Sequence, residues 1–216
     1  MSSSRAQARI RDAALQLFAE KGTEDLSVTE LAKAAGIARG TIYNNIESPE
    51  SLFEDVAGEL ATEMHRRVVE SYAAVEDPVA RLAHGIRFHI RRAHDEPAWG
   101  RFITRFAFSN PSLEAMWTGP PMRDVLTGMA LGRYDFPEAQ IPAVLAMIGG
   151  TSIATMVLVV EGHRSWRDAG ADSVELVLRA MGIDPKDART IACTDLPPLL
   201  EVKVSAPLEA RHERIR

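Results

Sequence analysis

The sequence predicts an all-α protein, with a three-helix unit at the N-terminus and a larger helical unit behind it. Apolar residues recur at the three- and four-residue spacing of amphipathic helices along most of the 216 residues. Capping and stopping residues separate these segments from one another. No segment shows the alternation of apolar and polar residues, bounded by hairpin turns, that is typical of strands.

The N-terminal unit is expected to contain three helices. Gly22 ends the first helix, whose last turn carries Lys21. Ser27 and Glu30 form a capping box that opens the second helix, and Gly36 closes it. A short third helix is expected over residues 39–46. The apolar stripe of the first helix consists of Ile10, Ala13, Ala14, Leu17 and Phe18.

A fourth helix is expected over residues 49–70, with Ser48 as its N-cap and Pro49 at its first position. Asp77-Pro78 is a break and marks a domain boundary. The stretch from about Asp195 contains three prolines and no clean period, which predicts an extended or partly disordered arm. Further helices are expected over 78–94, 97–108, 121–133, 138–163 and 172–182, with a short one after Asp184-Pro185.

Composition and charge exclude several classes of protein. Apolar residues make up 46% of the chain and charged residues 25%, so it is not collagenous, wholly disordered or a disulfide scaffold. A single cysteine, Cys193, excludes an internal disulfide and a cysteine-based zinc site. The start of the chain lacks the apolar core of a signal peptide, and we expect a reducing, cytoplasmic location. The net charge is −5, of which residues 1–46 carry +1 and the rest −6.

The segment most informative about function is residues 27–46, which read SVTELAKAAGIARGTIYNNI. A short helix, a turn containing Gly36 and a second short helix form a helix-turn-helix. In this motif the second helix enters the major groove of DNA, and the first crosses the backbone. Two packed helices that bind nothing would have the same spacing. The side chains of the second helix therefore have to distinguish a DNA-binding motif from a purely structural pair of helices.

Those side chains favour DNA. Arginine pairs well with guanine and asparagine with adenine, and a glycine lets the backbone come close to the duplex. No acidic residue lies between Glu30 and Glu47, whereas a solvated helix more often carries pairs of opposite charge. The outward side chains are Arg39, Thr41, Asn44 and Asn45, with Gly40 beside them and Tyr43 on the flank.

A further set of spaced residues in the segment 5–60 is shared with a known family: Phe18-Ala19-Glu20-Lys21-Gly22, Ser27-Val28, Leu31-Ala32, Ala34-Ala35-Gly36-Ile37 and Gly40-Thr41-Ile42-Tyr43. In these residues the segment resembles the N-terminal domain of the TetR family of bacterial transcriptional regulators. The resemblance implies a ligand-responsive repressor that binds a palindromic DNA operator as a homodimer and is released by a small, largely apolar effector. It also implies a protein that is not an enzyme and needs no cofactor.

The resemblance also implies roles for single residues. Thr29 and the start of the second motif helix match positions that touch DNA, and Tyr43 matches a tyrosine that contacts phosphate. Pro49 replaces a frequent lysine, whose loss removes one phosphate contact and makes the salt dependence shallower. Arg5, Arg9 and Arg11 are candidates to compensate. The predicted DNA-contacting set is Ser27, Thr29, Arg39, Gly40, Thr41, Tyr43, Asn44 and Asn45.

The resemblance divides the chain into a DNA-binding domain (1–48), a connecting helix (49–77), a helical effector-binding and dimerisation domain (78–193) and a C-terminal arm (194–216). Bulky and sulfur-containing side chains suit an adaptable cavity, although the same residues also build ordinary cores. His84, His89 and His94 are five residues apart and do not form the pair of a helical zinc site, so no metal is expected. Candidate effector contacts are His89, Phe102, Arg105, Phe106, Trp117, Met122, Met147, Thr151 and Thr155.

Residues 141–160 contain no charge and are long enough to span a membrane. Proline, glycines and hydroxyl residues interrupt them and no basic cluster flanks them, which favours a buried helix without membrane contact. Small residues there permit close helix approach in a four-helix dimer interface. The alternatives are a helical ligand-binding or membrane-associated protein whose helix-turn-helix is structural only, or an enzyme, for which no catalytic motif is present. The predicted interface consists of Gly149, Gly150, Ala154, Val174, Val177, Leu178 and Met181.

Overall fold

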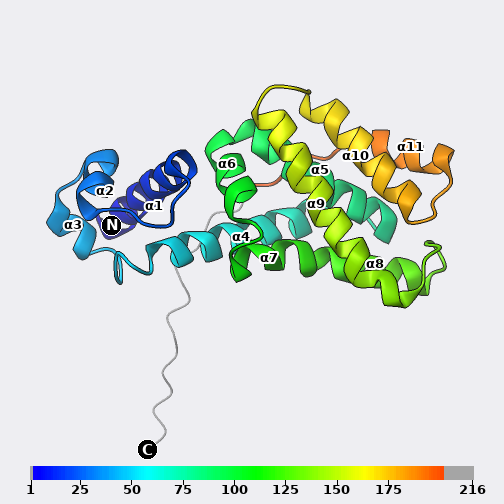
Figure 1. The fold of residues 1–216 in the computed structure, drawn as a ribbon, viewed down its shortest axis with the longest axis horizontal. Coiled ribbons are helices and arrows are strands. Elements are labelled where there is room, and N and C mark those ends of the chain that lie inside the picture. The colour runs from blue at the N-terminus through cyan, green and yellow to red at the C-terminus, as the bar shows by residue number, and fades with distance from the viewer. Residues whose placement is uncertain (1, 202–216) are drawn as a thin grey trace, which may run out of the picture.

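Residues 2–201 are described by a computed structural model, and all of their regular structure is helical, which confirms the all-α class (Figure 1). An N-terminal unit contains α1 (Ser2–Lys21), α2 (Val28–Ala35) and α3 (Arg39–Tyr43). The helix α4 (Leu52–Ser71) connects it to a C-terminal unit. That unit contains α5 (Pro78–Asp95), α6 (Pro97–Phe106), α7 (Pro111–Thr118), α8 (Pro120–Ala130), the 3-10 turn η1 (Glu138–Gln140), α9 (Ile141–Val160), α10 (Trp166–Ala180) and α11 (Pro185–Cys193).

The two helices of the motif begin and end for local reasons. The Ser27 hydroxyl accepts a hydrogen bond from the Glu30 amide at 3.2 Å, and the Glu30 carboxylate accepts one from the Ser27 amide at 3.3 Å. Gly36 ends α2 with φ +62°, a conformation that favours glycine. Ala38 precedes α3 without a side-chain cap, and α3 is held instead by Ile42, which is fully buried.

The connecting helix α4 starts later than the sequence predicted. Ser48 and Pro49 belong to a turn, in which the Ser48 hydroxyl accepts a hydrogen bond from the Ser51 amide at 3.1 Å. The regular helix begins at Leu52. One face of α4 is buried along its length, including Phe53, Leu60 and Met64, so the helix is packed into the protein rather than exposed as a free linker.

The helix α5 is the centre of the C-terminal unit. Asp77 caps it, accepting a hydrogen bond from the Val79 amide at 3.3 Å, and Pro78 occupies its first turn. It packs against α6, α8, α9, α10 and α11. Its buried side chains therefore include polar ones, His84, Arg87, His89 and Arg92 among them, that surface helices would leave in water.

In the C-terminal unit one helix was not predicted and another begins earlier than predicted. No helix was predicted between residues 108 and 121, where Asn110 starts α7, because its side chain accepts hydrogen bonds from two amides of the first turn. The helix predicted over 172–182 begins instead at Trp166, where the Ser165 hydroxyl accepts a hydrogen bond from the Asp168 amide at 3.1 Å. Both errors were missed N-caps.

The uncharged helix α9 is a core helix. With the turn before it, the segment Glu138–Val160 is long and apolar enough to cross a membrane by length and composition, but half of its most apolar stretch is buried inside the protein. It packs against α5, α6, α7 and α10. A single such helix is weak evidence for a membrane, and these contacts supply the burial that its composition requires.

Residues 194–201 carry no helix and return along α5 to α4. Arg87 donates a hydrogen bond to the Thr194 carbonyl. The Nε of Arg67 donates to the Leu200 carbonyl at 3.0 Å, and the Leu200 amide donates to the Ser71 hydroxyl at 2.8 Å. This part of the predicted arm is thus extended and attached, and the remainder of the arm, 202–216, lies outside the described residues.

Candidate DNA-binding and effector sites

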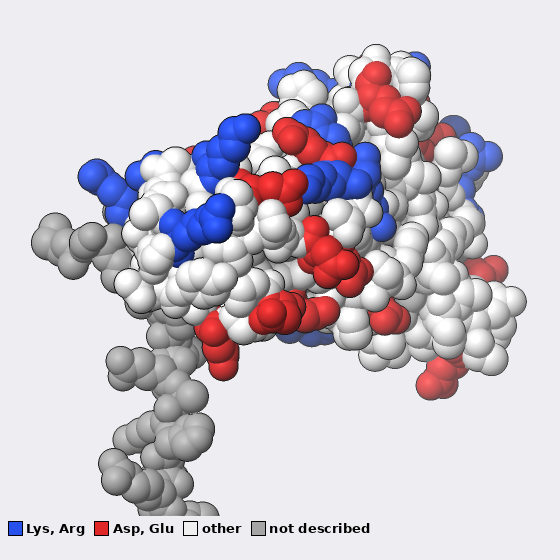
Figure 2. Space-filling view, turned by 60° about the vertical axis from the view of Figure 1, so that its left-hand side comes forward, with Lys and Arg blue, Asp and Glu red and all other residues white. Residues whose placement is uncertain are grey.

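The N-terminal unit presents most of the predicted DNA-contacting residues to solvent. Thr29, Arg39, Gly40, Tyr43 and Asn44 are exposed, and Thr41 is half-buried. A Cβ added at Gly40 would meet nothing within 4 Å, so the fold itself does not require glycine there. Figure 2, which brings this end of the molecule forward, shows basic side chains gathered at the upper left and acidic ones along the lower edge.

Two members of the predicted DNA-contacting set make bonds within the protein. Ser27 is engaged in the capping box, where its hydroxyl also donates to the Glu30 carboxylate at 2.8 Å. Asn45 is half-buried, and its amide donates to the Thr41 carbonyl at 2.8 Å. The hydrogen bonds of Lys21 and Ser27 hold the pKa of Glu30 at about 2. Ser27 and Asn45 therefore stabilise the motif through hydrogen bonds within it.

The arginines of α1 are also partly occupied. Arg9 donates to the carbonyls of Ala35 and Gly36, at 2.6 and 2.9 Å, and so completes the C-terminal end of α2. Arg11 lies 3.7 Å from the Glu59 carboxylate of α4. Of the three arginines expected to compensate for the missing lysine, Arg5 alone has neither a side-chain hydrogen bond nor an ion pair among the described residues.

An aromatic cluster joins the N-terminal unit to the rest of the protein. The rings of Phe18 (α1) and Phe53 (α4) lie edge to face with centroids 5.1 Å apart, and Phe53 contacts Phe106 (α6) at 4.9 Å. Phe102 packs against all three rings. The neighbouring Arg105 lies against Gly22, where an added Cβ would clash with its guanidinium. Three predicted effector residues, Phe102, Arg105 and Phe106, therefore lie at this joint.

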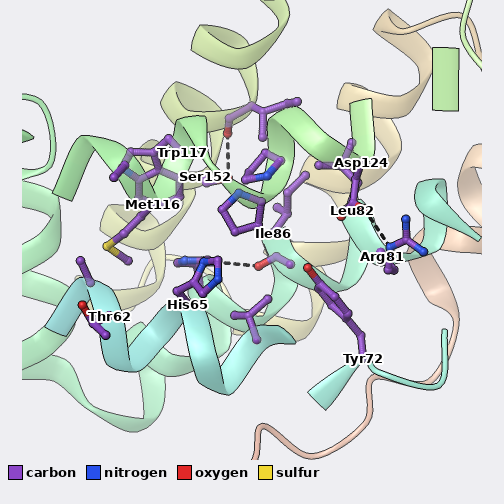
Figure 3. A pocket seen from close by; sticks show the side chains of 18 of the residues that line it. Thr62, His65, Tyr72, Arg81, Leu82, Ile86, Met116, Trp117, Asp124 and Ser152 are labelled. Carbon is purple, nitrogen blue, oxygen red and sulfur yellow. Dashed lines mark hydrogen bonds and ion pairs between the residues drawn. The ribbon is translucent and has the colours of Figure 1, made fainter. Parts of the chain in front are cut away.

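A cavity of about 390 Å³ lies between α4, α5, α7, α8 and α9 (Figure 3). This volume is near the lower end of the range for small-molecule sites, about 300–1,000 Å³. Two of the predicted effector residues, His89 and Trp117, line it. The rest of the wall is mostly apolar and includes Ala61, Val68, Leu82, Ile86, Met116, Pro120, Pro121 and Ile148.

Polar groups converge at one end of the cavity. The Nε of Arg81 donates to the Asp124 carboxylate at 2.8 Å, and Tyr72 also lines this end (Figure 3). Asp124 is 3% exposed, and burial raises the pKa of its carboxyl even though Arg81 opposes this. Burial also raises the pKa of the Tyr72 hydroxyl. The polar end of the cavity therefore offers a ligand the Arg81–Asp124 ion pair, whose charges compensate each other, and the Tyr72 hydroxyl.

The wall of the cavity also contains a neutral imidazole. His89 is 8% exposed, and burial lowers its pKa to about 4. Its Nδ1 lies 2.7 Å from the Gly85 carbonyl one turn earlier on α5. Its ring lies beside Trp117, with centroids 5.0 Å apart.

The remaining predicted effector residues lie outside this cavity. Met122, Met147 and Thr151 are half-buried but do not line it. Thr155 is buried and exchanges a hydrogen bond with Ser173 of α10 at 2.6 Å. Sequence reasoning missed the wall residues supplied by α4 and α7, because α4 was assigned to connection and α7 was not recognised. These include Tyr72, Ser112, Ala115 and Met116.

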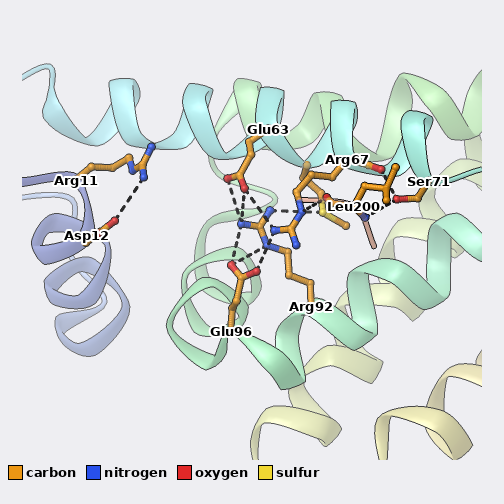
Figure 4. A network of polar contacts seen from close by, with 9 residues as sticks. Arg11, Asp12, Glu63, Arg67, Ser71, Arg92, Glu96 and Leu200 are labelled. Carbon is orange, nitrogen blue, oxygen red and sulfur yellow. Dashed lines mark hydrogen bonds and ion pairs between the residues drawn. The ribbon is translucent and has the colours of Figure 1, made fainter. Parts of the chain in front are cut away.

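An ionic network links α4 to α5 and α6 beside this cavity (Figure 4). Arg92, 3% exposed, donates to Glu63 at 3.1 Å and to Glu96 at 2.9 Å. Arg67 of α4 donates to Glu96 at 2.9 Å. Burial alone raises the pKa of the Glu96 carboxyl, but Arg92 and Arg67 outweigh it and lower that pKa.

The predicted dimer residues fall into two sets. Gly149 is buried, and a Cβ there would lie 3.2 Å from the Trp117 Cβ, so its small size serves packing within one protomer. By contrast, a Cβ at Gly150 meets nothing within 4 Å, and Ala154 is exposed. The structure places the α10 members of the prediction in the protomer's own core, where none is more than 2% exposed: Val174, Val177, Leu178 and Met181.

An exposed helix-turn-helix motif, a long connecting helix and a cavity along that helix define a ligand-responsive regulator of transcription. The chain belongs to the TetR family. The family described as "Bacterial regulatory proteins, tetR family" matches residues 10–56, and "Tetracyclin repressor-like, C-terminal domain" matches residues 77–194. This is a family of DNA-binding transcriptional regulators rather than enzymes, and its members bind small-molecule effectors, typically as dimers.

Individual relatives agree with this assignment. The HTH-type transcriptional regulator Rv1255c of Mycobacterium tuberculosis is 27% identical over 204 residues, which cover 94% of this chain and 90% of the relative. The structure of RolR in complex with resorcinol superposes with a TM-score of 0.68 at 24% identity, covering 92% of this chain and 98% of RolR. FadR of Bacillus subtilis with stearoyl-CoA gives 0.65 at 22% identity, covering 81% and 96%.

Proposed function

We propose that the protein represses transcription from a palindromic operator that it binds as a homodimer, and that it releases the operator when a small, largely apolar effector fills the cavity. The supporting domains are those expected from the sequence: DNA-binding (1–48), connecting (49–77), effector-binding and dimerisation (78–193) and a C-terminal arm (194–216). We place the protein in the cytoplasm, where its DNA is, with α9 used for packing rather than for a membrane.

The observation that carries this proposal is the double use of α4. Its middle and C-terminal parts line the cavity, through residues such as Ala61 and Val68. Its N-terminal part holds α1 through the contact of Phe53 with Phe18. A molecule in the cavity therefore touches the same rigid element that positions the motif.

A change in affinity follows from this connection by population shift. An effector that prefers the conformation with badly spaced recognition helices lowers operator affinity, and the operator lowers effector affinity by the same factor. The named ligands of two proteins with this fold, resorcinol in RolR and stearoyl-CoA in FadR, are consistent with a small-molecule site in this unit.

The dimer is proposed to form through the free faces of α9 and α10. The small residues Gly150 and Ala154 permit another helix to approach α9 closely, and Leu158 on the same helix is 43% exposed. On α10 the solvent-facing apolar side chain is Leu176, at 61% exposure. Two such helices from each protomer make a four-helix interface. Two recognition helices about 34–36 Å apart then reach successive major grooves of an inverted repeat.

The test is selection from random double-stranded DNA with the purified protein at fixed salt. Enrichment of an inverted repeat supports a dimeric sequence reader and supplies the operator. Binding that depends only on salt would instead favour the alternative, a helical ligand-binding protein whose motif is structural. Release of the enriched operator is then measured for compounds that raise the melting temperature of the protein.

The interface is tested by a pair of glycine substitutions. Gly150→Leu points into open space in the protomer, so the variant is expected to keep its helical circular dichroism and to become monomeric by light scattering. Gly149→Leu is the contrast, because it overpacks against Trp117 and destabilises the protomer itself. A Gly150→Leu protein that remains dimeric would move the interface elsewhere.

A further inference from the structure

His89 gives the wall of the cavity a buried hydrogen-bond acceptor without a partner, and the position of a proton identifies the atom. The Gly85 carbonyl only accepts, so His89 Nδ1, 2.7 Å from it, carries the hydrogen. Because burial keeps the ring neutral, Nε2 is then a bare lone pair. It lies on the far side of the ring from the α5 backbone, to which Nδ1 is bonded.

This acceptor opens toward the cavity. Among the described residues no group bonds to His89 Nε2. The polar atoms that are fully enclosed without a partner include Trp117 Nε1 but not His89 Nε2. The histidine itself lines the cavity and is otherwise buried, so the opening faces the cavity space. A ligand group that donates a hydrogen bond satisfies this atom, whereas a group that only accepts opposes it.

The charge of the wall selects against ions. Two cations lie near the polar end. Arg81 lines the cavity and already donates to Asp124 and, at 2.8 Å, to the Glu76 carbonyl. The exposed Arg123 does not line the cavity and interacts with Tyr72 and Asp124. Asp124 is correspondingly neutralised by Arg81. A carboxylate or an ammonium group entering this space would lose its hydration without gaining an unpaired partner charge, which is costly. The cavity therefore suits a neutral molecule.

The shape of the wall favours a ring. Trp117 forms one side beside His89, and Met116, Pro120 and Pro121 are neighbouring wall residues. Flat aromatic ligands gain contact area and favourable ring geometry against such residues. The volume of about 390 Å³ also favours a compact molecule over a long chain.

We infer that the effector is a neutral phenol-type compound, whose ring lies against Trp117 and whose hydroxyl donates a hydrogen bond to His89 Nε2. This inference rests on the proposed function, because it takes the cavity as the effector site. It makes His89 the residue that determines specificity, and it assigns the Tyr72, Arg81 and Asp124 end to a second polar substituent where the compound has one.

The experiment is calorimetric titration of the full-length protein, without DNA, with four compounds close in size. 4-Propylphenol is expected to bind about tenfold more tightly than 4-propylanisole, which keeps the ring and the oxygen but has no hydrogen to donate. It is also expected to bind more tightly than 4-propylbenzoate, an anion, and than 1-nonanol, a chain with a hydroxyl. Equal binding of phenol and anisole overturns the role of His89, and tighter binding of benzoate or nonanol overturns the ligand class.

Two variants locate the effect. His89→Phe keeps a ring of similar size and is expected to bind the phenol about tenfold more weakly, with the phenol–anisole preference abolished. Ser152→Ala is the matched control in the same cavity, since its hydroxyl already donates to the Ile148 carbonyl at 2.7 Å, and it should keep that preference. The wild-type comparison of phenol with anisole stands even if His89→Phe fails to fold.

Failure of this inference and failure of the proposed function give different results. If the phenol binds but does not release the selected operator, the ligand class stands and the coupling to DNA fails. If none of the four compounds binds to a protein that does select an operator, the phenol inference is overturned while the DNA-binding function stands.

Discussion

The contacts of α4 differ between its two ends, near the N-terminal unit (α1–α3) and further into the C-terminal unit (α5–α11). Near the DNA-binding end an aromatic cluster dominates, in which Phe53 joins Phe18 of α1 to Phe102 and Phe106 of α6, and the ion pair Arg11–Glu59 lies on the same part of α4. Further along α4 the specific contacts are ionic, with Arg92 of α5 between Glu63 and Glu96. Apolar packing is short in range and sensitive to shape, whereas ion pairs accept some displacement. A displacement of α4 is therefore expected to change the energy of the aromatic packing near the motif more than that of the ion pairs further along the helix.

The largest expected effect comes from breaking the aromatic attachment. Phe53 is 4% exposed and contacts Phe18, Phe102 and Phe106, so Phe53→Ala is expected to destabilise the protein by about 3–5 kcal/mol. Urea unfolding measures this. Phe108→Ala is the control, because Phe108 is 67% exposed and its loss should change stability little. A cost of under 1 kcal/mol for Phe53→Ala would show that the cluster is not the main joint.

A second effect, confined to the C-terminal unit, depends on pH. The pKa of His89 is about 4 in the folded protein and about 6.5 when unfolded, so the unfolded chain binds more protons between these values. Stability therefore falls as the pH decreases through this window, by about 2–3 kcal/mol between pH 7.5 and 4.5.

The measurement is the difference in unfolding free energy between wild type and His89→Phe across this pH range, because other titrating groups cancel in the difference. The exposed His163 provides the control substitution, His163→Phe. If the difference in unfolding free energy does not change with pH, the charged imidazole of His89 is in contact with water in the folded protein and the prediction is wrong.

The ionic attachment is expected to contribute less than the aromatic one. Arg92 is buried, but the carboxylates of Glu63 and Glu96 are 21% and 42% exposed and remain partly hydrated. Arg92→Met is therefore expected to cost about 1–3 kcal/mol. A double-mutant cycle with Glu96→Gln, at low and high salt, isolates the pair. No measurable coupling would show that the Arg92–Glu96 pair does not stabilise the attachment of α4.

The smallest effect on stability is expected in the recognition helix. Arg39 is exposed, so Arg39→Ala should leave unfolding unchanged while relaxing base preference by about 1–3 kcal/mol at one position. Asn45→Ala removes a bond to the Thr41 carbonyl, and it should cost stability before it alters base preference. Competition binding against single-base operator variants measures the preference. If base preference changes in Asn45→Ala and not in Arg39→Ala, then Asn45 contacts the base and Arg39 does not, and the prediction is wrong.

The predictability of the two units from sequence differs for a physical reason. The motif is specified locally: Ser27, Glu30 and Gly36 fix the limits of α2 through bonds to their own neighbours. The cavity is specified by contacts between distant segments, and periodicity cannot say whether Phe102 faces a ligand or Phe18. His89 lies on a predicted helix, whereas Trp117 was included for its bulk alone, because α7, which carries it, was not predicted. Met116, its neighbour on α7, was left out of the predicted set.

The same limit applies to burial. The apolar stripe of α10 was assigned to a partner protomer, but Val174 and Leu178 are satisfied within the chain. The amphipathic pattern shows that a face is buried and does not show against what. Likewise, Arg9 and Asn45 have polar side chains suited to DNA, but both donate hydrogen bonds to backbone carbonyls of the motif itself.

The attachment of residues 194–201 also determines the point in synthesis at which the C-terminal end of α4 gains its hydrogen bonds to Leu200. Arg67 and its acceptor, the Leu200 carbonyl, are 133 residues apart in the chain. Chains fold progressively from the N-terminus as the ribosome releases them. Every described helix, α1 to α11, therefore emerges before Leu200 can close its bonds to Arg67 and Ser71. A nascent chain stalled at Cys193 would hold all of these helices, with the far end of α4 not yet tied down.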